Sequence, residues 1–367
     1  MIDCAPLIVA DARRLFAKYG VRVDLKRQTG WATVREKILH NELDAAHAHA
    51  SMAYGIHCGI GMVARNCLTG VVLSLNGSAI TISNELWNLG VKDATTLRAL
   101  IERQRGKRKF VFASVLHLSS QNFVIRRWLQ SAGIDPDRDV QMVVLPSTLV
   151  HDNLLQGHID GYCVGEPWSS VLVADGRAKC VAASGEVCPS HPEKVLLVLK
   201  EFAEQRAMEH LAMIAAIIEA SQFCQAPENR EELVRILAQP AYLDIEPRFL
   251  ANCLRGPFNT GGGERAIDDL VIYSGRGANV PSRDKAKWVY EEIDAHCRPR
   301  NTPAFRRDVM RKVFREDIYW DAVDLVETVS PGLVPVEARR TQPPRLRDLA
   351  QNRAPQTLSK SMESVPC

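Results

Sequence analysis

Residues 71–83, VVLSLNGSAITIS, decide how this chain folds. The run is apolar and rich in β-branched residues, which is typical of buried strand. Asn76-Gly77 interrupts it, and this pair is typical of a turn or of a break within a strand. The run therefore predicts buried strand structure in two parts.

Helical and strand-like segments alternate on both sides of this run. Residues 10–20 have the pattern of a short amphipathic helix, and residues 21–27, VRVDLKR, alternate like a strand. The alternation continues to a helix at 120–133 and a strand-to-loop junction at 161–168. Strands that alternate with helices of this length predict an α/β protein with parallel layers. From about residue 202 the pattern becomes helical, and residues 207–225 are the strongest helix candidate.

The composition is that of a globular chain with a sizeable core, since 46% of the 367 residues are hydrophobic and 24% are charged. Lys plus Arg exceed Asp plus Glu by 46 − 43 = 3, too small an excess for nucleic-acid binding by bulk charge. Residues 335–367 are rich in Pro, Arg, Gln and Ser, carry that whole excess, and are predicted to be a disordered tail. No stretch has the roughly 18–20 apolar residues of a membrane span. We expect neither a membrane span nor direct nucleic-acid contact.

Ten cysteines are scattered along the chain without a C-x-x-C pair or the Cys/His spacing of a zinc site. The N-terminal segment has an acid at Asp3 and no basic region, unlike a signal peptide. Unpaired cysteines together with the missing leader favour a reducing compartment. The predicted location is the cytoplasm, with the periplasm as the alternative if a leader lies upstream of Met1.

Motifs of the common enzyme classes, such as G-x-S-x-G, the P-loop and H-E-x-x-H, do not occur in the sequence. Gly261–Gly263 is interpreted as a turn and Arg103–Lys109 as a solvated loop. His47 and His49 have the spacing of one strand face, but no carboxylate or Cys lies near enough in sequence to complete a metal site. We interpret them as packing or hydrogen-bonding residues, and we predict no catalytic residue, metal or other cofactor.

Polar and aromatic residues instead gather where strand-like segments end. These clusters are residues 29–31, 51–54, 76–78, 119–122 and 165–168. In open α/β sheets the carboxyl ends of the strands line the ligand crevice, and the free N–H groups of a helix start suit a small anion. Ser119–Asn122 fits such a helix start. Donors and aromatics without a nucleophile–base pair indicate a binding protein rather than an enzyme.

The order of eight segments resembles the nitrate- and bicarbonate-binding receptors of ABC transporters. These segments are DCAPLIVA (3–10), GWATVREK (30–37), LDAAHAHASMAY (43–54), LNGSAITIS (75–83), RRWLQSAGIDPDRDV (126–140), GYCVGEPW (161–168), SGEVCPSHPEK (184–194) and Gln222-Phe223-Cys224. GYCVGEPW followed by HPEK is the most specific part. The resemblance covers residues 3 to about 290. It implies an α/β, two-lobe type II periplasmic-binding-protein fold with a ligand cleft between the lobes and a helical C-terminal segment.

The resemblance also implies a domain division, with the chain crossing between the lobes near Asn76-Gly77 and again near Val164–Glu166. The expected parts are lobe one (1–76 plus 167–290), lobe two (77–166), a helical segment (291–334) and the tail (335–367).

Four positions of the family's ligand pocket can be matched to this sequence. Trp31 matches the aromatic wall of the pocket, and Lys194 matches the lysine that pairs with the anion. Ser78 stands where nitrate receptors have glutamine, and Gln121 stands where they have histidine. Both can donate hydrogen bonds, but Ser78 is shorter and Gln121 cannot become cationic. The implied ligand is therefore nitrate or nitrite, with another small planar anion left open.

Gly165 and Glu166 of the GEPW motif complete the predicted ligand-binding set. In bicarbonate receptors acidic residues help to hold a metal, but no second carboxylate matches here. Glu166 is therefore expected to cap the loop between the lobes.

Within the family, a receptor without a leader is similar to the cytoplasmic nitrate/nitrite sensors of the NasS type. Such a sensor holds an RNA-binding antiterminator of the NasT type and releases it when the anion binds, which regulates nitrate assimilation. The alternative is the solute-binding receptor of a nitrate-type ABC transporter whose leader is absent from this chain. An enzyme of the related pyrimidine-precursor branch ranks last, because its cysteine-rich segment and its histidine find no match here.

Overall fold

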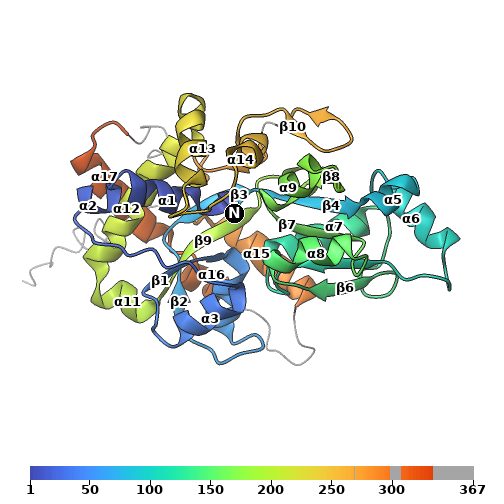
Figure 1. The fold of residues 1–367 in the computed structure, drawn as a ribbon. Coiled ribbons are helices and arrows are strands. Elements are labelled where there is room, and N and C mark those ends of the chain that lie inside the picture. The colour runs from blue at the N-terminus through green and yellow to red at the C-terminus, as the bar shows by residue number, and fades with distance from the viewer. Residues whose placement is uncertain (268, 298–306, 334–367) are drawn as a thin grey trace, which may run out of the picture.

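Two β-sheets lie side by side in the protein, and each has helices on both faces (Figure 1). The structure is a computed structural model that describes residues 1–267, 269–297 and 307–333. The N-terminus lies near the boundary between the two sheets (Figure 1). The predicted tail at 335–367 lies outside the described residues.

The first sheet has the strand order β1-β9-β3-β12, with β2 also paired to β9. Its strands are β1 (Ala45–His49), β2 (Cys67–Leu68), β3 (Val72–Asn76), β9 (Pro192–Leu199) and β12 (Val271–Ile272). Every pairing in it is antiparallel. In β9 all eight residues are buried, although two of them, Glu193 and Lys194, are charged.

The second sheet has the order β6-β5-β7-β4-β8. Its strands are β4 (Ser78–Ser83), β5 (Val111–Ser114), β6 (Gln141–Val144), β7 (Gly161–Gly165) and β8 (Ala178–Ala183). Parallel pairing joins β5 to β6 and to β7, whereas β4 pairs antiparallel with β7 and β8. The predicted parallel layers are thus confined to β5, β6 and β7, where helical crossovers join successive strands that lie side by side in the sheet.

The run at 71–83 forms β3 and β4, and the chain passes from the first sheet to the second across Gly77. Asn76 and Gly77 both have positive φ angles, 58° and 97°, as a sharp change of direction requires. The sequence places the return crossing near Val164–Glu166. In the structure Ala178–Ala183 still pairs with β4, so the chain rejoins the first sheet only between β8 and β9. The alternation of helical and strand-like segments does not reveal that β8 pairs antiparallel with β4. β8 forms one edge of the second sheet.

Helices cover the first sheet on two faces. Val71 and Leu73 pack into one core and Val72 into the other, as alternation along a strand requires. Leu75 packs with Val72 because the register of β3 shifts between Ser74 and Leu75. The helices that contribute to the first core are α1 (Ala5–Ala12), α2 (Leu15–Lys18), α12 (Ala207–Gln225), α13 (Arg230–Ala238), α14 (Pro247–Leu254) and α17 (Glu316–Val329). Those of the second core are α3 (Trp31–Leu39), α4 (Ala50–Cys58), α15 (Arg283–His296) and α16 (Arg307–Val313).

The second sheet is covered in the same way. Its helices are α5 (Asn84–Asn88), α6 (Ala94–Arg103) and α7 (Ser120–Ser131) on one side, and α8 (Val150–Leu155) and α9 (Trp168–Ala174) on the other. Two short helices, α10 (Ser184–Val187) and α11 (Lys200–Gln205), flank β9. Ser119 caps α7 by accepting a hydrogen bond from Asn122 N at 3.1 Å, and Gly133, with φ 75°, follows the helix end.

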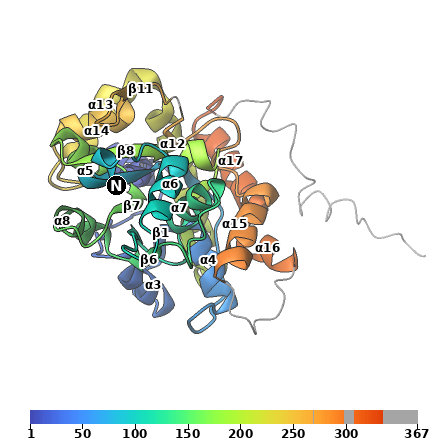
Figure 2. The same cartoon turned by 90° about the vertical axis from the view of Figure 1, so that its right-hand side faces the viewer.

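The C-terminal helices return to the first sheet. Figure 2 shows α15 and α16 beside α4, although more than 200 residues separate them in sequence. The helical C-terminal segment expected from the sequence is therefore present in the described residues. Among the helices that the structure describes, none is both long and apolar enough to cross a membrane.

Candidate functional site

Lys194 is fully buried in β9, at the boundary between the two sheets. Its ammonium Nζ lies 2.8 Å from Asp3 Oδ2 and 2.5 Å from Glu193 Oε1. Asp3 belongs to a short 3-10 helix (Ile2–Cys4) that precedes α1, and both carboxylates are also fully buried. A buried lysine of this kind is stable only with such partners, because an unpaired buried charge is strongly unfavourable.

All three groups are ionised. Burial alone would raise the pKa of Asp3, but the charge of Lys194 and the neighbouring His47 hold that pKa well below its usual value. For Glu193 the opposing effect of burial is likewise overcome by Lys194 and by the hydrogen bond with His191, so its pKa is also lowered. Burial would lower the pKa of Lys194, yet Asp3 and then Glu193 raise it. The site is a fixed arrangement of one cation and two anions.

Trp31 and two histidines cover this lysine. The Trp31 ring, at the first position of α3, lies 5.2 Å from Lys194 Nζ, which is within the range of a cation–π contact. His49 is the register partner of Lys194 in the β1–β9 ladder, and its ring centroid lies 4.4 Å from that of Trp31. His47, two residues earlier on the same strand, places Nε2 3.2 Å from Asp3 Oδ1. The His47–His49 pair thus contributes hydrogen bonding and packing.

The start of α7 reaches across from the second sheet. Gln121 Nε2 donates a 3.0 Å hydrogen bond to Glu193 Oε1, and Ser120 Oγ lies 3.3 Å from His49 Nδ1. Because Glu193 is ionised and can only accept, the Gln121 amide must turn its NH₂ group toward it. Ser120 and Gln121 lie in the segment that was expected to offer hydrogen-bond donors to an anion. The same two residues also join the two sheets.

Gly165, the last residue of β7, completes this group because it has no side chain. A Cβ atom at this position would lie 3.3 Å from both Asp3 Oδ2 and Gln121 Nε2. Without a side chain, the backbone of β7 can lie this close to Asp3 and Gln121. We use the name lysine cluster for Asp3, Trp31, His47, His49, Gln121, Gly165, His191, Glu193 and Lys194.

Two predicted residues, Ser78 and Glu166, have their contacts elsewhere. Ser78 stands opposite Gly165 in the β4–β7 ladder, and its N–H donates to Ser184 Oγ at 3.2 Å. Glu166 Oε2 accepts hydrogen bonds from Ser170 N at 3.1 Å and Ser170 Oγ at 2.8 Å. The thiol of Cys253 donates to the same oxygen at 3.3 Å. These three residues, Glu166, Ser170 and Cys253, form a second buried group that we call the glutamate cluster.

The glutamate cluster differs from the lysine cluster in its charge. Burial raises the pKa of Glu166, and the hydrogen bonds from Ser170 oppose that rise only in part. The residue ties the end of β7 to α9 and α14. The structure therefore brings together Trp31, Gln121, Gly165 and Lys194, and it leaves Ser78 and Glu166 beside them.

Five members of the lysine cluster were not expected as site residues. His47 and His49 were interpreted as packing or hydrogen-bonding residues, and Asp3, His191 and Glu193 lie in segments that carry the family resemblance but were given no role. A signal exists for Glu193, because two adjacent charges open the apolar strand run PEKVLLVL and must be neutralised if the strand is buried. Asp3 gives no such signal, since it meets Lys194 only through the fold.

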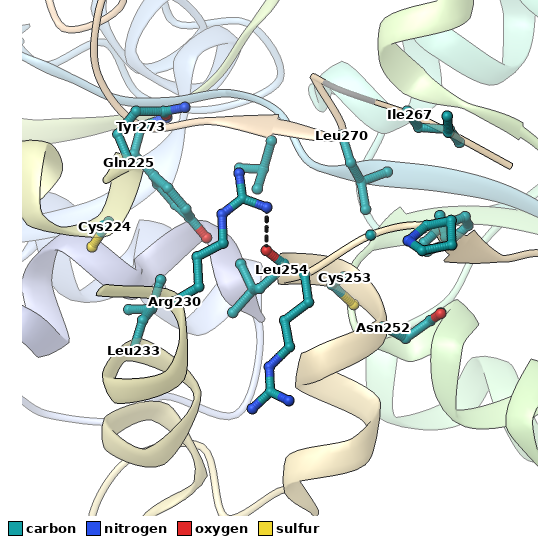
Figure 3. Close-up of a pocket in the computed structure, with 16 residues that line it drawn as sticks. Cys224, Gln225, Arg230, Leu233, Asn252, Cys253, Leu254, Ile267, Leu270 and Tyr273 are labelled. Atoms are coloured by element: carbon teal, nitrogen blue, oxygen red, sulfur yellow. Dashed lines mark hydrogen bonds between the residues drawn. The ribbon is translucent and has the colours of Figure 1, made fainter. Parts of the chain in front are cut away.

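The described residues also enclose a cavity of about 320 Å³ away from the lysine cluster. It lies among the end of α12, α13, α14 and Ile267, Leu270 and Tyr273. Figure 3 shows Arg230 across it, donating to Leu254 O at 2.7 Å. Its wall includes Cys253 of the glutamate cluster but none of the predicted ligand-binding residues. Within the described part of the chain, no group of His, Cys, Asp or Glu has the arrangement of a metal site.

Comparisons with known proteins place these features in a family. The model of the NMT1-like family matches residues 1–238. The nitrate/nitrite binding protein NrtA of Synechococcus elongatus is 30% identical over 345 residues, which cover 89% of this chain and 76% of the relative. The nitrate import ATP-binding protein NrtC of Synechocystis sp. is 32% identical over 329 residues, 88% of this chain. The chain spans about half of that relative, 48% of its length.

A solved structure has the same fold. The periplasmic nitrate-binding protein NrtA from Synechocystis PCC 6803 superposes with a TM-score of 0.83 at 26% identity, covering 92% of this chain and 89% of that one. This confirms the predicted two-lobe fold. The receptors among these relatives are named as binding proteins, which confirms the expectation of a binding protein rather than an enzyme.

Proposed function

Because the chain belongs to the NMT1-like family, we propose that it binds a small inorganic anion, nitrate or nitrite, at the lysine cluster. Two relatives named for nitrate binding support the ligand class. The observation that carries the proposal is Lys194 itself, a fully buried ammonium at the boundary between two lobes. Buried lysines are rare, and one placed where two lobes meet is suited to ligand binding.

The residues around Lys194 can each contribute to holding an anion. An ammonium and a monovalent anion about 4 Å apart attract each other by roughly 1–4 kcal/mol, depending on the local dielectric. The carboxylates of Asp3 and Glu193 beside Lys194 oppose this attraction, so the other contacts must contribute as well. Trp31 supplies a flat wall, and the start of α7 supplies backbone N–H groups and a partial positive charge. Gly165 allows the β7 backbone to approach. Movement of the lobes about the crossing at Gly77 would admit the anion and bury it.

Isothermal titration with nitrate tests this proposal. We expect the unmodified protein to bind, Lys194→Ala to lose most of its affinity, and Lys200→Ala to be unchanged, because Lys200 is half-exposed and pairs only with Glu204 at the surface. Since the loss of Lys194 also affects stability, a thermal melt of the unmodified protein with and without nitrate provides a second readout. A ligand that binds the folded state must raise the melting temperature. Equal affinity in Lys194→Ala and unmodified protein would refute the site.

Two physiological roles follow from anion binding. The receptor of a nitrate-type ABC transporter, periplasmic like its solved relative, is the role that the relatives favour. The cytoplasmic sensor that holds a NasT-type antiterminator is the second candidate. The nine described cysteines, all free thiols and six of them buried, suit a reducing compartment.

Co-expression with a NasT-type antiterminator separates these roles. A sensor must form a complex that millimolar nitrate or nitrite dissociates, and its partner must weaken anion binding by the same factor. A coupling of about 1–3 kcal/mol corresponds to roughly 5–150-fold in each direction. A transport receptor forms no such complex. Size-exclusion chromatography with and without each anion gives the answer.

A further inference from the structure

The α15 helix contacts both lobes, each of which is built on one of the two sheets. It packs beside α4 on the first sheet, and Figure 2 shows it beside α7, which covers the second sheet. The half-buried ring of Trp288, on α15, contacts the cores of both sheets. This helix therefore lies across the boundary between the lobes, where the proposed anion site also lies.

The α7 helix sends one side chain into the opposite lobe. Its other buried apolar residues pack on the second sheet, but Phe123 is buried in a core of the first. The Phe123 ring lies edge-on to Trp288, with centroids 6.2 Å apart, and stacks on His296 at 6.1 Å. Just before the helix, Leu118 O accepts a 2.9 Å hydrogen bond from Ser51 Oγ on α4. The N-terminal half of α7 is thus docked on the first lobe.

An ion pair extends this contact one turn further along α7. Arg127 Nε and Nη2 both contact Glu292 Oε1 on α15. The side chain of Glu292 is 1% exposed, whereas that of Arg127 is 46% exposed. His296 Nε2 lies 3.5 Å from Glu292 Oε2, but burial lowers the pKa of His296 to about 4, so its ring is neutral at pH 7.

Arg127 is the main cation that acts on Glu292. Burial raises the pKa of Glu292, and Arg127 is the largest of the effects that oppose this rise. His191 opposes the rise more weakly, and Glu291 adds to it. If Arg127 moved away with α7, the carboxylate of Glu292 would lose its main partner, which is unfavourable for a buried charge. The pair therefore favours the position in which α7 and α15 touch.

The same α7 helix carries part of the proposed anion site. Gln121, in its first turn, donates to Glu193, and the backbone N–H groups of that turn are the donors proposed for the anion. Arg127 lies further along the same helix. Because an α-helix is held together by its own backbone hydrogen bonds, its two ends move as one body. A contact at Arg127 therefore fixes the position of Gln121.

We propose that Glu292 is a positioning residue of the anion site, which holds α7 against the first lobe through Arg127 and thereby slows the release of the anion. This inference rests on the proposed function. Lys194 is fully buried, so an anion beside it reaches solvent only when the lobes separate. Separation lifts α7 from α15 and breaks the pair of Arg127 and Glu292. Loss of the pair therefore lowers the barrier to release.

Stopped-flow mixing with nitrate, followed by tryptophan fluorescence, tests this inference. Trp31 in the lysine cluster and Trp288 at the contact both report on binding. The slope and the intercept of the observed rate against nitrate concentration give the association and dissociation rate constants. We expect Arg127→Gln to raise the dissociation rate constant about tenfold, as loss of a charged hydrogen bond predicts. The association rate constant should not fall, because the anion site itself is unchanged.

A double-variant comparison tests whether the two residues act as a pair. Glu292→Gln alone should raise the dissociation rate constant about as much as Arg127→Gln. The double variant should release nitrate no faster than either single variant, because the second change finds no pair left to break. A further tenfold rise in the double variant would show that the two residues act independently, and it would overturn the inference.

The matched control is Asp137→Asn. Asp137 pairs with Arg126, the neighbour of Arg127 on α7, at 2.6 Å, but this pair lies within the second lobe. Its dissociation rate constant must equal that of the unmodified protein. Equal acceleration in Asp137→Asn and Arg127→Gln, or no acceleration in Arg127→Gln, would overturn the inference while nitrate binding stands. Absence of nitrate binding by the unmodified protein would overturn the proposed function and the inference with it.

Discussion

The lysine cluster and the glutamate cluster each hold a buried glutamate close to the boundary between the sheets. The lysine cluster surrounds its glutamate with positive charge, whereas the glutamate cluster surrounds its glutamate with neutral hydrogen-bond donors. Glu193 is surrounded by Lys194, His191 and the Gln121 amide, and its pKa is lowered. Glu166 receives hydrogen bonds from a backbone N–H, a hydroxyl and a thiol, and its pKa is raised.

The difference distinguishes the buried acid of the proposed ligand site from the buried acid outside it. Glu193 keeps a lysine charged in the interior, where an anion can use that charge. Glu166 holds α9 and α14 to the end of β7 and brings no cation with it. Burial alone therefore does not identify a functional carboxylate, whereas the charge of its partners does.

The largest expected effect comes from removing the cation of the lysine cluster. Lys194→Ala leaves Asp3 and Glu193 buried without their shared partner, so we expect a loss of about 3–5 kcal/mol in the free energy of unfolding. Urea denaturation at pH 7 measures it, with Lys200→Ala as the control for loss of an exposed lysine. A midpoint within error of the unmodified protein would mean that the two carboxylates do not depend on Lys194.

Isosteric changes at the two glutamates compare the clusters directly. Glu193→Gln exchanges charged for neutral hydrogen bonds and is expected to lower the free energy of unfolding by about 2 kcal/mol at pH 7. Glu166→Gln is expected to leave the free energy of unfolding unchanged or to raise it, because an ionised carboxylate without a cation is unfavourable there. The same denaturation experiment measures both. Equal losses in the free energy of unfolding of the two variants would show that the two clusters do not differ in this way.

The pH dependence of stability has opposite signs at the two sites. Since the pKa of Glu193 is lowered by folding, its contribution is present above the unfolded value near 4.5 and is lost as the pH falls. Since the pKa of Glu166 is raised by folding, the folded state binds more protons than the unfolded state. Stability therefore declines as the pH rises above the unfolded value near 4.5. The free energy of unfolding measured from pH 3 to 8 tests both statements. In Glu193→Gln the loss of stability at acid pH should be absent, and in Glu166→Gln the decline in stability above pH 4.5 should be absent. Unaltered curves in both variants would contradict the assignment.

A smaller effect is expected from the wall of the lysine cluster. Trp31→Ala removes surface but no charge, so nitrate affinity should fall by less than in Lys194→Ala. Trp87→Ala is the matched control, because Trp87 is also a half-buried tryptophan with a lysine, Lys92, over its ring at 3.1 Å. Titration of both variants with nitrate measures the contrast. An effect of Trp87→Ala equal to that of Trp31→Ala would show that general destabilisation is responsible.

The sequence allowed the fold class, the break at Asn76-Gly77 and four members of the lysine cluster to be predicted, mostly through the family resemblance. It did not identify the partners of Lys194, because Asp3 lies 191 residues away and only the fold brings the two together. Residues 21–27 were predicted as a strand but form none. Their alternation reflects Val21 and Val23 packing on the core of α1 and α12, and burial on one side does not require a neighbouring strand.

Gly165 sets a limit on how wide the anion site can be. A single methyl group there would already press against Asp3 and Gln121, which belong to opposite lobes. Nitrate and nitrite are both bulkier than a methyl group. An anion that touches the Gly165 backbone therefore requires Gln121 to move away from Asp3, by rotation of its side chain or by movement of its lobe. Where the lobe moves, the distance between the outer rims of the two lobes changes as well, and a partner protein that contacts both rims would sense the bound anion without touching it.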